Sequence, residues 1–245
     1  IQHGLVREAL RLTGIESGVE ITTIADIPGQ GTGLGSSSSV TVGLLNAMYA
    51  FQGREATKEQ LAEEACQIEI DTLGAPIGRQ DQYAASFGGV NSIRFGENGV
   101  QVEPIEVSEG LSKKFSENFT LVFTGMTRSA SKVLSEQSDD ESDKNSRMRE
   151  IRKHADEAVS FIQQGDLNSL GSILNQTWIS KRGVSSMVTN TQLDDLYESA
   201  ISSGAIGAKL LGAGNGGFLL VCGNRQLRGI LQSKLGAGHR MFPCL

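Results

Sequence analysis

The fold and function of this chain depend on one glycine- and serine-rich stretch, DIPGQGTGLGSSSSVTVGLLNAM, which spans Asp26–Met48. An apolar pattern of helical spacing follows directly behind the serines. Two structural interpretations exist for such a stretch: a flexible linker, or an ordinary loop that ends in a serine N-cap. The third interpretation is an anion site, where the backbone N–H groups of a helix N-terminus point at phosphate.

The segments on either side of the stretch favour the anion site. Residues 18–26 alternate in polarity and are rich in β-branched side chains, which predicts a strand that runs into the loop. Residues 36–52 predict a helix that is apolar on most sides and therefore buried. The glycines leave the backbone open to close approach, and the first amides of the helix are hydrogen-bond donors. We therefore expect phosphate to contact Gly31, Gly33, Leu34, Gly35, Ser36, Ser37 and Ser38.

Familiar nucleotide-binding motifs do not explain the glycine-rich stretches. A P-loop requires a lysine before its Ser or Thr, and residues 33–39 (GLGSSSS) contain none. The Rossmann spacing occurs at residues 212–217 (GAGNGG), but that stretch leads into an expected strand rather than into a helix. We expect residues 212–217 to form a turn between two strands.

Composition limits the class of protein. The chain has 245 residues, 38% of them hydrophobic, which is enough for one large core or two small ones. Its net charge of −6 provides no basic field for nucleic acid or a membrane surface, and no apolar run has membrane-spanning length. The three cysteines are widely spaced, which fits a reducing, cytoplasmic compartment and offers no zinc pattern. The oligomeric state stays open.

The order of the expected elements indicates the α+β class, because blocks of strands and helices do not alternate strictly. A polar segment at residues 108–117 suggests two domains, 1–117 and 118–245. Thr57 and Gln60 form an expected capping box. Helices are expected at residues 3–13, 36–52, 57–74, 129–136, 146–164, 167–180, 191–203 and 224–235, and strands at 18–26, 90–95, 100–107, 118–125 and on both sides of 212–217.

Two acidic residues give the second indication of phosphate chemistry. Glu69 lies late in an expected helix between Ile68 and Ile70, and Asp81 lies in the loop expected at residues 75–89. A single helical glutamate more often faces solvent. Phosphoryl transfer, however, requires a carboxylate or hydroxyl for Mg²⁺ and a carboxylate that orients or deprotonates the attacking hydroxyl. The serines, the glutamate and the aspartate together meet that requirement.

Three motifs in this order resemble those of the GHMP kinases. They are residues 28–39 (PGQGTGLGSSSS), residues 78–89 (GRQDQYAASFGG) and residues 209–221 (KLLGAGNGGFLLV). The resemblance implies an ATP- and Mg²⁺-dependent kinase. It also implies an N-terminal domain like ribosomal protein S5 domain 2, a ferredoxin-like C-terminal domain, and an active site between them.

The resemblance also implies roles for single residues. Ser37 and Glu69 match the metal-binding serine and glutamate, and Asp81 matches the catalytic aspartate. The far wall of the nucleotide site falls on Gly212, Gly214 and Gly216. The family's glycine-rich first motif is absent, so we expect the N-terminal part of the domain to be missing from this chain. Asn215 stands where glycine is usual, and asparagine tolerates the left-handed conformation better than most residues.

More narrowly, the chain resembles family members that phosphorylate the anomeric hydroxyl of a phosphorylated heptose, a step that supplies nucleotide-activated heptose for surface polysaccharide. Such an acceptor needs fixed cations, and arginine can bind two phosphate oxygens at once. We expect Arg128 to bind the acceptor phosphate, with Arg79 and Gln82 beside it. The alternative for Arg128 is a loop arginine that pairs with the acidic stretch at residues 139–141. Lys181 and Arg182 are further candidates, with a solvated helix end as the alternative. Three other functions stay open: a fucose, galactose or mannose 1-kinase, a catalytically silent sugar- and nucleotide-binding relative, and a structural glycine-rich module.

Overall fold

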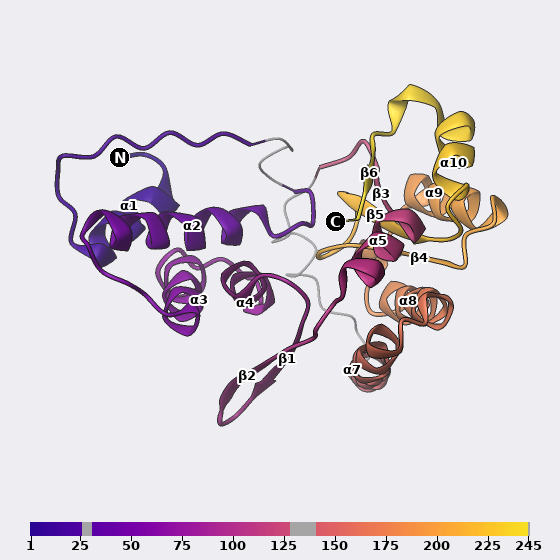
Figure 1. Ribbon diagram of the computed structural model, residues 1–245, viewed down its shortest axis with the longest axis horizontal. Helices are drawn as coiled ribbons and strands as arrows, with labels where there is room; N and C mark the ends of the chain where they lie inside the picture. Colours follow the sequence, from indigo (N-terminus) through magenta and orange to yellow (C-terminus); the bar gives the residue numbers. More distant parts are fainter. Residues whose placement is uncertain (26–30, 128–140, 245) are drawn as a thin grey trace. The chain divides into compact units, whose positions relative to one another are not determined.

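The computed structural model describes residues 1–25, 31–127 and 141–244, and these group into two compact units (Figure 1). The first unit consists of Ile1–Gln30 and Gly35–Pro104, and the second of Gly31–Leu34 and Ile105–Leu245. The ranges expected from the sequence place residues 31–34 and 105–117 with the first domain instead. That domain division stays a prediction.

The first unit is built around helix α2 (Ser36–Phe51), which packs against three other helices (Figure 1). These are α1 (Gly4–Thr13), α3 (Lys58–Cys66) and α4 (Gln80–Phe87). Helix α3 continues directly into a π-helical turn, η1 (Gln67–Thr72). A hairpin of β1 (Asn91–Gly96) and β2 (Gly99–Pro104) completes the unit.

Several local predictions are confirmed in this unit. Gly14 adopts the left-handed conformation and ends α1. The side chain of Thr57 accepts a hydrogen bond from the backbone N–H of Gln60 at 3.1 Å and so caps α3. The strands expected at residues 90–95 and 100–107 correspond to β1 and β2, which pair with Gly96 opposite Gly99.

The strand expected at residues 18–26 is wrong over the residues that the structure describes. Residues 18–25 form no strand, and Ile24 is 92% exposed. A strand requires a neighbour that takes up its backbone hydrogen bonds, and the described chain provides none here. The helix expected at residues 129–136 lies outside the described residues.

The second unit contains a four-stranded antiparallel sheet in the order β4-β5-β3-β6. Its strands are β3 (Phe119–Phe123), β4 (Gly207–Leu210), β5 (Phe218–Cys222) and β6 (Met241–Pro243). The sheet shares its core with Trp178, which is 1% exposed. The helices of the unit are α5 (Glu109–Asn118), α7 (Glu141–Gln164), α8 (Leu167–Arg182), α9 (Thr191–Ser202) and α10 (Leu227–Leu235), with short turns η2 (Ser186–Val188) and η3 (Gly236–Gly238).

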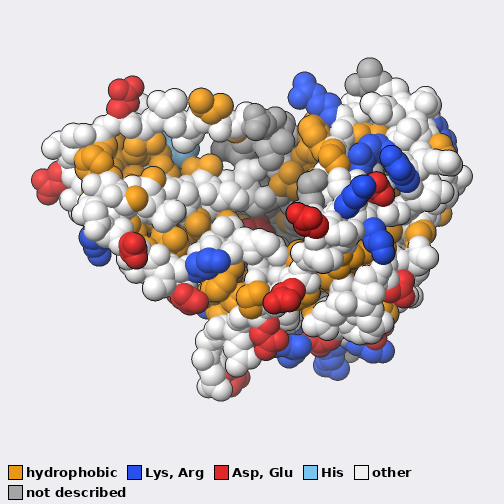
Figure 2. All heavy atoms as spheres, in the orientation of Figure 1, with side chains coloured by type: hydrophobic (Ala, Val, Ile, Leu, Met, Phe, Trp, Pro, Cys, Tyr) orange, Lys and Arg blue, Asp and Glu red, His pale blue; other side chains and the backbone are white. Residues whose placement is uncertain are grey.

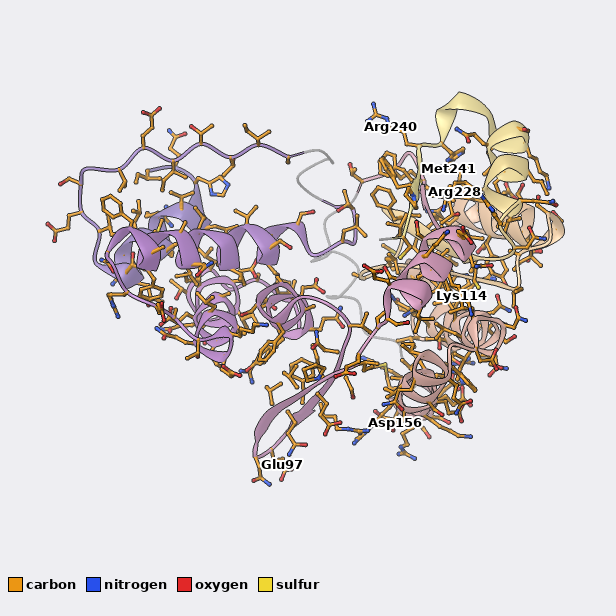
Figure 3. All side chains as sticks on the ribbon, viewed as in Figure 1. Glu97, Lys114, Asp156, Arg228, Arg240 and Met241 are labelled. Atoms are coloured by element: carbon orange, nitrogen blue, oxygen red, sulfur yellow. The ribbon has the colours of Figure 1, made fainter. Side chains whose placement is uncertain are left out.

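Arg228 fastens α10 to the sheet (Figure 3). Its Nε donates a hydrogen bond to the Thr120 hydroxyl at 3.1 Å, and its Nη2 donates to the backbone carbonyl of Phe119 at 3.2 Å. One side chain therefore ties the closing helix to the start of β3.

Acidic and basic side chains are interspersed on the face shown in Figure 2, with apolar side chains between them. Phe51, at the end of α2, is 63% exposed.

Within the described ranges, no helix combines the length and the apolar composition needed to cross a bilayer.

Helix α8 packs against β4 backbone to backbone. A Cβ atom on Gly207 of β4 would lie 2.0 Å from the carbonyl oxygen of Gly171 and 2.9 Å from the Cβ of Asn175. Both of these residues belong to α8, so the helix touches the strand at a point where no side chain fits.

We predict that Gly207→Ala destabilises the second unit by about 1–3 kcal/mol, because the added methyl forces α8 and β4 apart. Urea denaturation followed by the fluorescence of Trp178, the single tryptophan, reports on this unit. Gly229→Ala is the matched control, since a Cβ at this exposed position of α10 meets no atom within 4 Å. The control should be stabilising by about 0.5–1 kcal/mol. Equal stability of the two variants would contradict the close contact.

Candidate active site

The N-terminus of α2 lacks a side-chain cap within the described residues. Gly35 occupies the N-cap position with φ 65°, and the first helical hydrogen bond joins the Ser39 N–H to the Gly35 carbonyl at 2.9 Å. The N–H groups of Ser37 and Ser38 therefore have no helical acceptor. No acidic residue occupies the first turn of α2, so no charge within the helix offsets the positive end of its dipole, which stabilises a nearby anion.

Glu69 is a buried carboxylate that two neutral side chains hold. It lies on η1 and is 2% exposed. Its Oε2 accepts a hydrogen bond from the Ser38 hydroxyl at 2.8 Å and another from Gln82 Nε2 at 2.6 Å. In the part of the chain that the structure describes, no lysine or arginine forms an ion pair with it. A buried negative charge without a counterion favours the binding of a cation.

Asp81 lies beside the start of α2. A Cβ atom on Gly35 would lie 3.1 Å from Asp81 Cβ and 3.4 Å from its Oδ2, so only glycine at position 35 leaves the carboxylate room. Asp81 belongs to the first turn of α4 rather than to the loop expected from the sequence. Burial raises the pKa of Asp81, and the charge of Glu69 raises it further, while the Gln80 side chain lowers it. A carboxylate with a raised pKa is a stronger proton acceptor.

Ser37 and Ser38 differ in their surroundings. Ser38 is 1% exposed and bonds to Glu69, whereas Ser37 is exposed. The resemblance singled out Ser37 as the metal-binding serine, and the contact between Ser38 and Glu69 was missed. Helical spacing could have indicated it, because Ser38 lies one turn before the buried Thr41 and two turns before the buried Leu45.

Two of the residues expected at the acceptor phosphate, Gln82 and Arg79, contact other side chains of the first unit. Gln82 is 0% exposed and donates to Glu69, while its Oε1 has no hydrogen-bond partner among the described residues. Arg79 forms an ion pair with Glu63 of α3 and stacks over the Tyr83 ring, 5.6 Å from its centre. Arg128 lies outside the described residues. Gln82 thus supports Glu69, and its role at the acceptor phosphate stays a prediction.

Two glycine-rich segments, residues 31–34 and 212–217, both belong to the second unit. A Cβ on Gly33 would lie 2.6 Å from the carbonyl oxygen of Leu211, and one on Gly217 would lie 2.2 Å from that of Thr32. The Phe218 N–H donates to the Thr32 carbonyl at 3.1 Å. Residues 31–34 therefore lie against the turn at 212–217. This backbone contact by itself requires glycine at positions 33 and 212, which were expected to hold nucleotide.

Asn215 has φ 57°, the left-handed conformation that its residue type tolerates. Its backbone N–H donates to the carbonyl of Val188 at 2.7 Å, and its side-chain Oδ1 accepts a hydrogen bond from Asn190 Nδ2. The side chain that replaces the usual glycine therefore ties the turn to the N-cap of α9.

A recess of about 730 Å³ lies on the first unit, lined by residues that include Glu63, Cys66, Asp71 and Arg79. Neither Glu69 nor Asp81 lines it. The helix terminus and the two carboxylates, rather than this recess, form the candidate site.

Two family descriptions match the chain. "GHMP kinases N terminal domain" covers residues 3–89, which include Ser38, Glu69 and Asp81, and "GHMP kinases C terminal" covers residues 158–237. The chain belongs to the GHMP kinase family.

Individual GHMP kinases support this assignment. The D-glycero-alpha-D-manno-heptose 7-phosphate kinase of Campylobacter jejuni is 34% identical over 200 residues, which are 80% of this chain and 59% of that protein. The bifunctional fucokinase/GDP-fucose pyrophosphorylase of Arabidopsis thaliana is 28% identical over 236 residues, 89% of this chain and 22% of that protein. The chain thus spans less than two thirds of the length of both relatives.

A solved structure shows the fold. The crystal structure of a D-glycero-D-manno-heptose 1-phosphate kinase from Bacteroides thetaiotaomicron matches with a TM-score of 0.77 at 23% identity, over 98% of this chain and 70% of that one. The expected two-domain α+β GHMP kinase fold is therefore confirmed.

We predict that Ser38→Ala destabilises the first unit by about 1–3 kcal/mol, because it removes a donor from the buried Glu69 carboxylate. Ser37→Ala, one position earlier on the same helix, should change stability by no more than about 0.5 kcal/mol. Hydrogen exchange of the α2 amides measures both effects, since Trp178 reports only on the other unit. A larger loss for Ser37→Ala than for Ser38→Ala would contradict the geometry of this GHMP kinase site.

Proposed function

We propose that the chain carries the catalytic residues of an ATP-dependent sugar kinase. Its acceptor would be D-glycero-D-manno-heptose 7-phosphate, phosphorylated on the anomeric hydroxyl to the 1,7-bisphosphate. The observation that carries the proposal is the juxtaposition of Glu69 and Asp81 with the uncapped N-terminus of α2. Family membership supports the reaction class, and the name of the C. jejuni relative supports the substrate.

The amides at the start of α2 suit the phosphates of ATP. Gly35 allows an anion to approach the backbone, and the N–H groups of Ser37 and Ser38 are directed along the helix axis. The positive end of the helix dipole would stabilise the charge on the transferring phosphoryl group.

The donor set beside these amides fits Mg²⁺. Carboxylate and hydroxyl oxygens are the hard ligands that this ion prefers, and Glu69 lacks a counterion among the described residues. Those residues contain no group of three or more His, Cys, Asp or Glu that could hold a metal. Glu69 and one serine would therefore hold the ion together with ATP oxygens and water, as in other kinases. The family resemblance favours Ser37, and the contact with Glu69 favours Ser38. When bound, Mg²⁺ neutralises charge on the phosphates.

Asp81 would accept or orient the proton of the attacking hydroxyl. The hydroxyl oxygen forms a bond to the γ-phosphorus in line with the breaking bond to the β-phosphate oxygen, and ADP leaves. An anomeric hydroxyl is more acidic than an ordinary alcohol, so a carboxylate whose pKa is raised by burial is an adequate base.

A second candidate acceptor is fucose or another free sugar, because the fucokinase relative matches 89% of the chain. We favour the sugar phosphate and assign its phosphate to Arg128. We also propose that the enzyme works in the cytoplasm, since Cys66, Cys222 and Cys244 are free thiols.

We predict that the protein, given ATP, Mg²⁺ and the heptose 7-phosphate, releases ADP and forms an anomeric phosphate visible by phosphorus NMR. Fucose, galactose and mannose, tested in parallel, should give at least about tenfold less product. Asp81→Asn should lower turnover by about 10²- to 10⁴-fold, because the amide cannot accept the proton. Its affinity for ADP, measured by calorimetry, should change by less than about threefold, because Asp81 serves the acceptor.

Asp71→Asn is the matched control for this substitution. Asp71 lies on η1 and is exposed, so the same change of charge there should leave turnover nearly unchanged. Normal turnover in Asp81→Asn would remove Asp81 from the mechanism, and a preference for fucose would overturn the assigned acceptor.

A further inference from the structure

Two lysines of the second unit lie together beside the glycine turn. Lys181 is in the last turn of α8, and its Nζ donates a hydrogen bond to the backbone carbonyl of Gly212, where the turn begins. Lys209 is in β4, two residues after Gly207. Alternate residues of a strand point to the same face, and Gly207 faces α8 directly. Lys209 therefore lies on the face of the sheet that α8 covers, and Lys181 is a residue of α8 itself.

The contact between α8 and β4 brings Lys181 alongside Gly212, three residues after Lys209. Lys181 follows Gly171 by ten residues of helix, and Gly212 follows Gly207 by five residues that begin in β4. At 1.5 Å per helical residue and about 3.3 Å per strand residue, the two advances are similar, about 15 Å along the helix and about 17 Å along the strand. The hydrogen bond from Lys181 to Gly212 confirms that the two elements reach the turn side by side.

The carboxylates near these lysines have other partners. Arg182 pairs with Asp194 of α9 at 2.9 Å, and Glu150 of α7 accepts a hydrogen bond from Ser180 at 2.9 Å. Across the described ranges, neither Lys181 nor Lys209 forms an ion pair. Both residues are half-buried, so solvent still reaches them.

Placing two cations together without a counter-charge is unfavourable. Burial lowers the pKa of Lys181 to about 8, to which the charge of Lys209 contributes, and burial also lowers the pKa of Lys209. An anion that binds between the two lysines would offset the repulsion at Lys181 and favour the charged form of both side chains. Phosphate suits the position, because it carries between one and two negative charges near pH 7 and lysine binds it as a point charge.

We propose that Lys181 and Lys209 form a binding site for a phosphate oxyanion on the second unit, beside Gly212. The two available sources are a phosphate of the nucleotide and the phosphate of the sugar acceptor. The choice of these two ligands rests on the proposed function. The two unpaired positive charges of Lys181 and Lys209 do not depend on it.

The first test is competitive acylation of the protein's lysines, followed by peptide mass spectrometry. Inorganic phosphate is compared with chloride at equal ionic strength. Phosphate should slow the labelling of Lys181 and Lys209 by at least about fivefold. Lys114, which lies exposed on α5 (Figure 3), should be labelled at the same rate in both solutions. This arm uses the unmodified protein, so it depends neither on catalysis nor on the folding of a variant.

The second test identifies the source. Protection by ADP at lower concentration than by heptose 7-phosphate assigns the site to the nucleotide, and the reverse assigns it to the acceptor. Lys209→Gln should then weaken the binding of that ligand by about ten- to a hundredfold, the loss expected for one charge-assisted contact. Lys114→Gln is the control of equal charge change and should have no effect.

The inference is overturned if phosphate, ADP and heptose 7-phosphate all fail to protect Lys181, because the lysine would then serve only to hold the Gly212 carbonyl. Phosphoryl transfer by the unmodified protein is measured separately. A kinase without protection at Lys181 would therefore disprove this site and leave the proposed function standing.

Discussion

The buried carboxylate of Glu69 is the interaction on which the candidate site depends. Removing a carboxylate from water costs several kcal/mol unless donors replace its hydration. Ser38 of α2 and Gln82 of α4 supply those donors, and Glu69 itself comes from the π-helical turn η1. One oxygen atom thus fixes three elements of the first unit relative to one another.

The position of Asp81 follows from that arrangement. Gln82 has to face Glu69, so the preceding residue lies at the start of α4 and against Gly35. A π-turn, which often marks a functional position, places Glu69 where α3 would otherwise continue regularly. The two carboxylates and the open helix terminus are therefore consequences of a single packing arrangement.

Each unit contains two like charges that lack an oppositely charged partner among the described residues. In the first unit, Glu69 and Asp81 have no cationic partner among the described side chains. In the second unit, Lys181 and Lys209 have no acidic partner over the same ranges. On the two proposals made above, each pair would lower its electrostatic cost by binding an external ion, a metal cation in the first case and a phosphate in the second. A metal–nucleotide complex contains both a metal cation and phosphates.

Local signals made much of this fold predictable from the sequence. Gly14 and Thr57 mark helix ends through their own backbone and side-chain chemistry, so neighbouring residues suffice to place them. Residues 18–25 have the composition of a strand, but pairing depends on a partner that the local sequence does not reveal. Helices α4 and α5 were missed because short helices with polar sequences are stabilised mainly by packing against other elements.

The candidate site was predictable to a similar extent. Motif order singled out Glu69 and Asp81 as candidates, because their positions after the glycine-rich stretch match the family pattern. The choice between Ser37 and Ser38 depends on which face of α2 is buried, and an all-round apolar helix leaves that face ambiguous. The roles of Gln82 and Lys181 depend on contacts between residues 13 and 31 positions apart, which only the folded chain reveals.

A double-mutant cycle between Ser38 and Glu69 tests the central claim most directly. The free energy of opening of α2 is measured by hydrogen exchange in the parent protein, Ser38→Ala, Glu69→Gln and the double variant. If the hydroxyl and the carboxylate hold the helices together, the effects should be non-additive, with a coupling energy of about 1–3 kcal/mol. Effects that add within about 0.5 kcal/mol would show that the two side chains act independently, and Glu69 would then not organise the site.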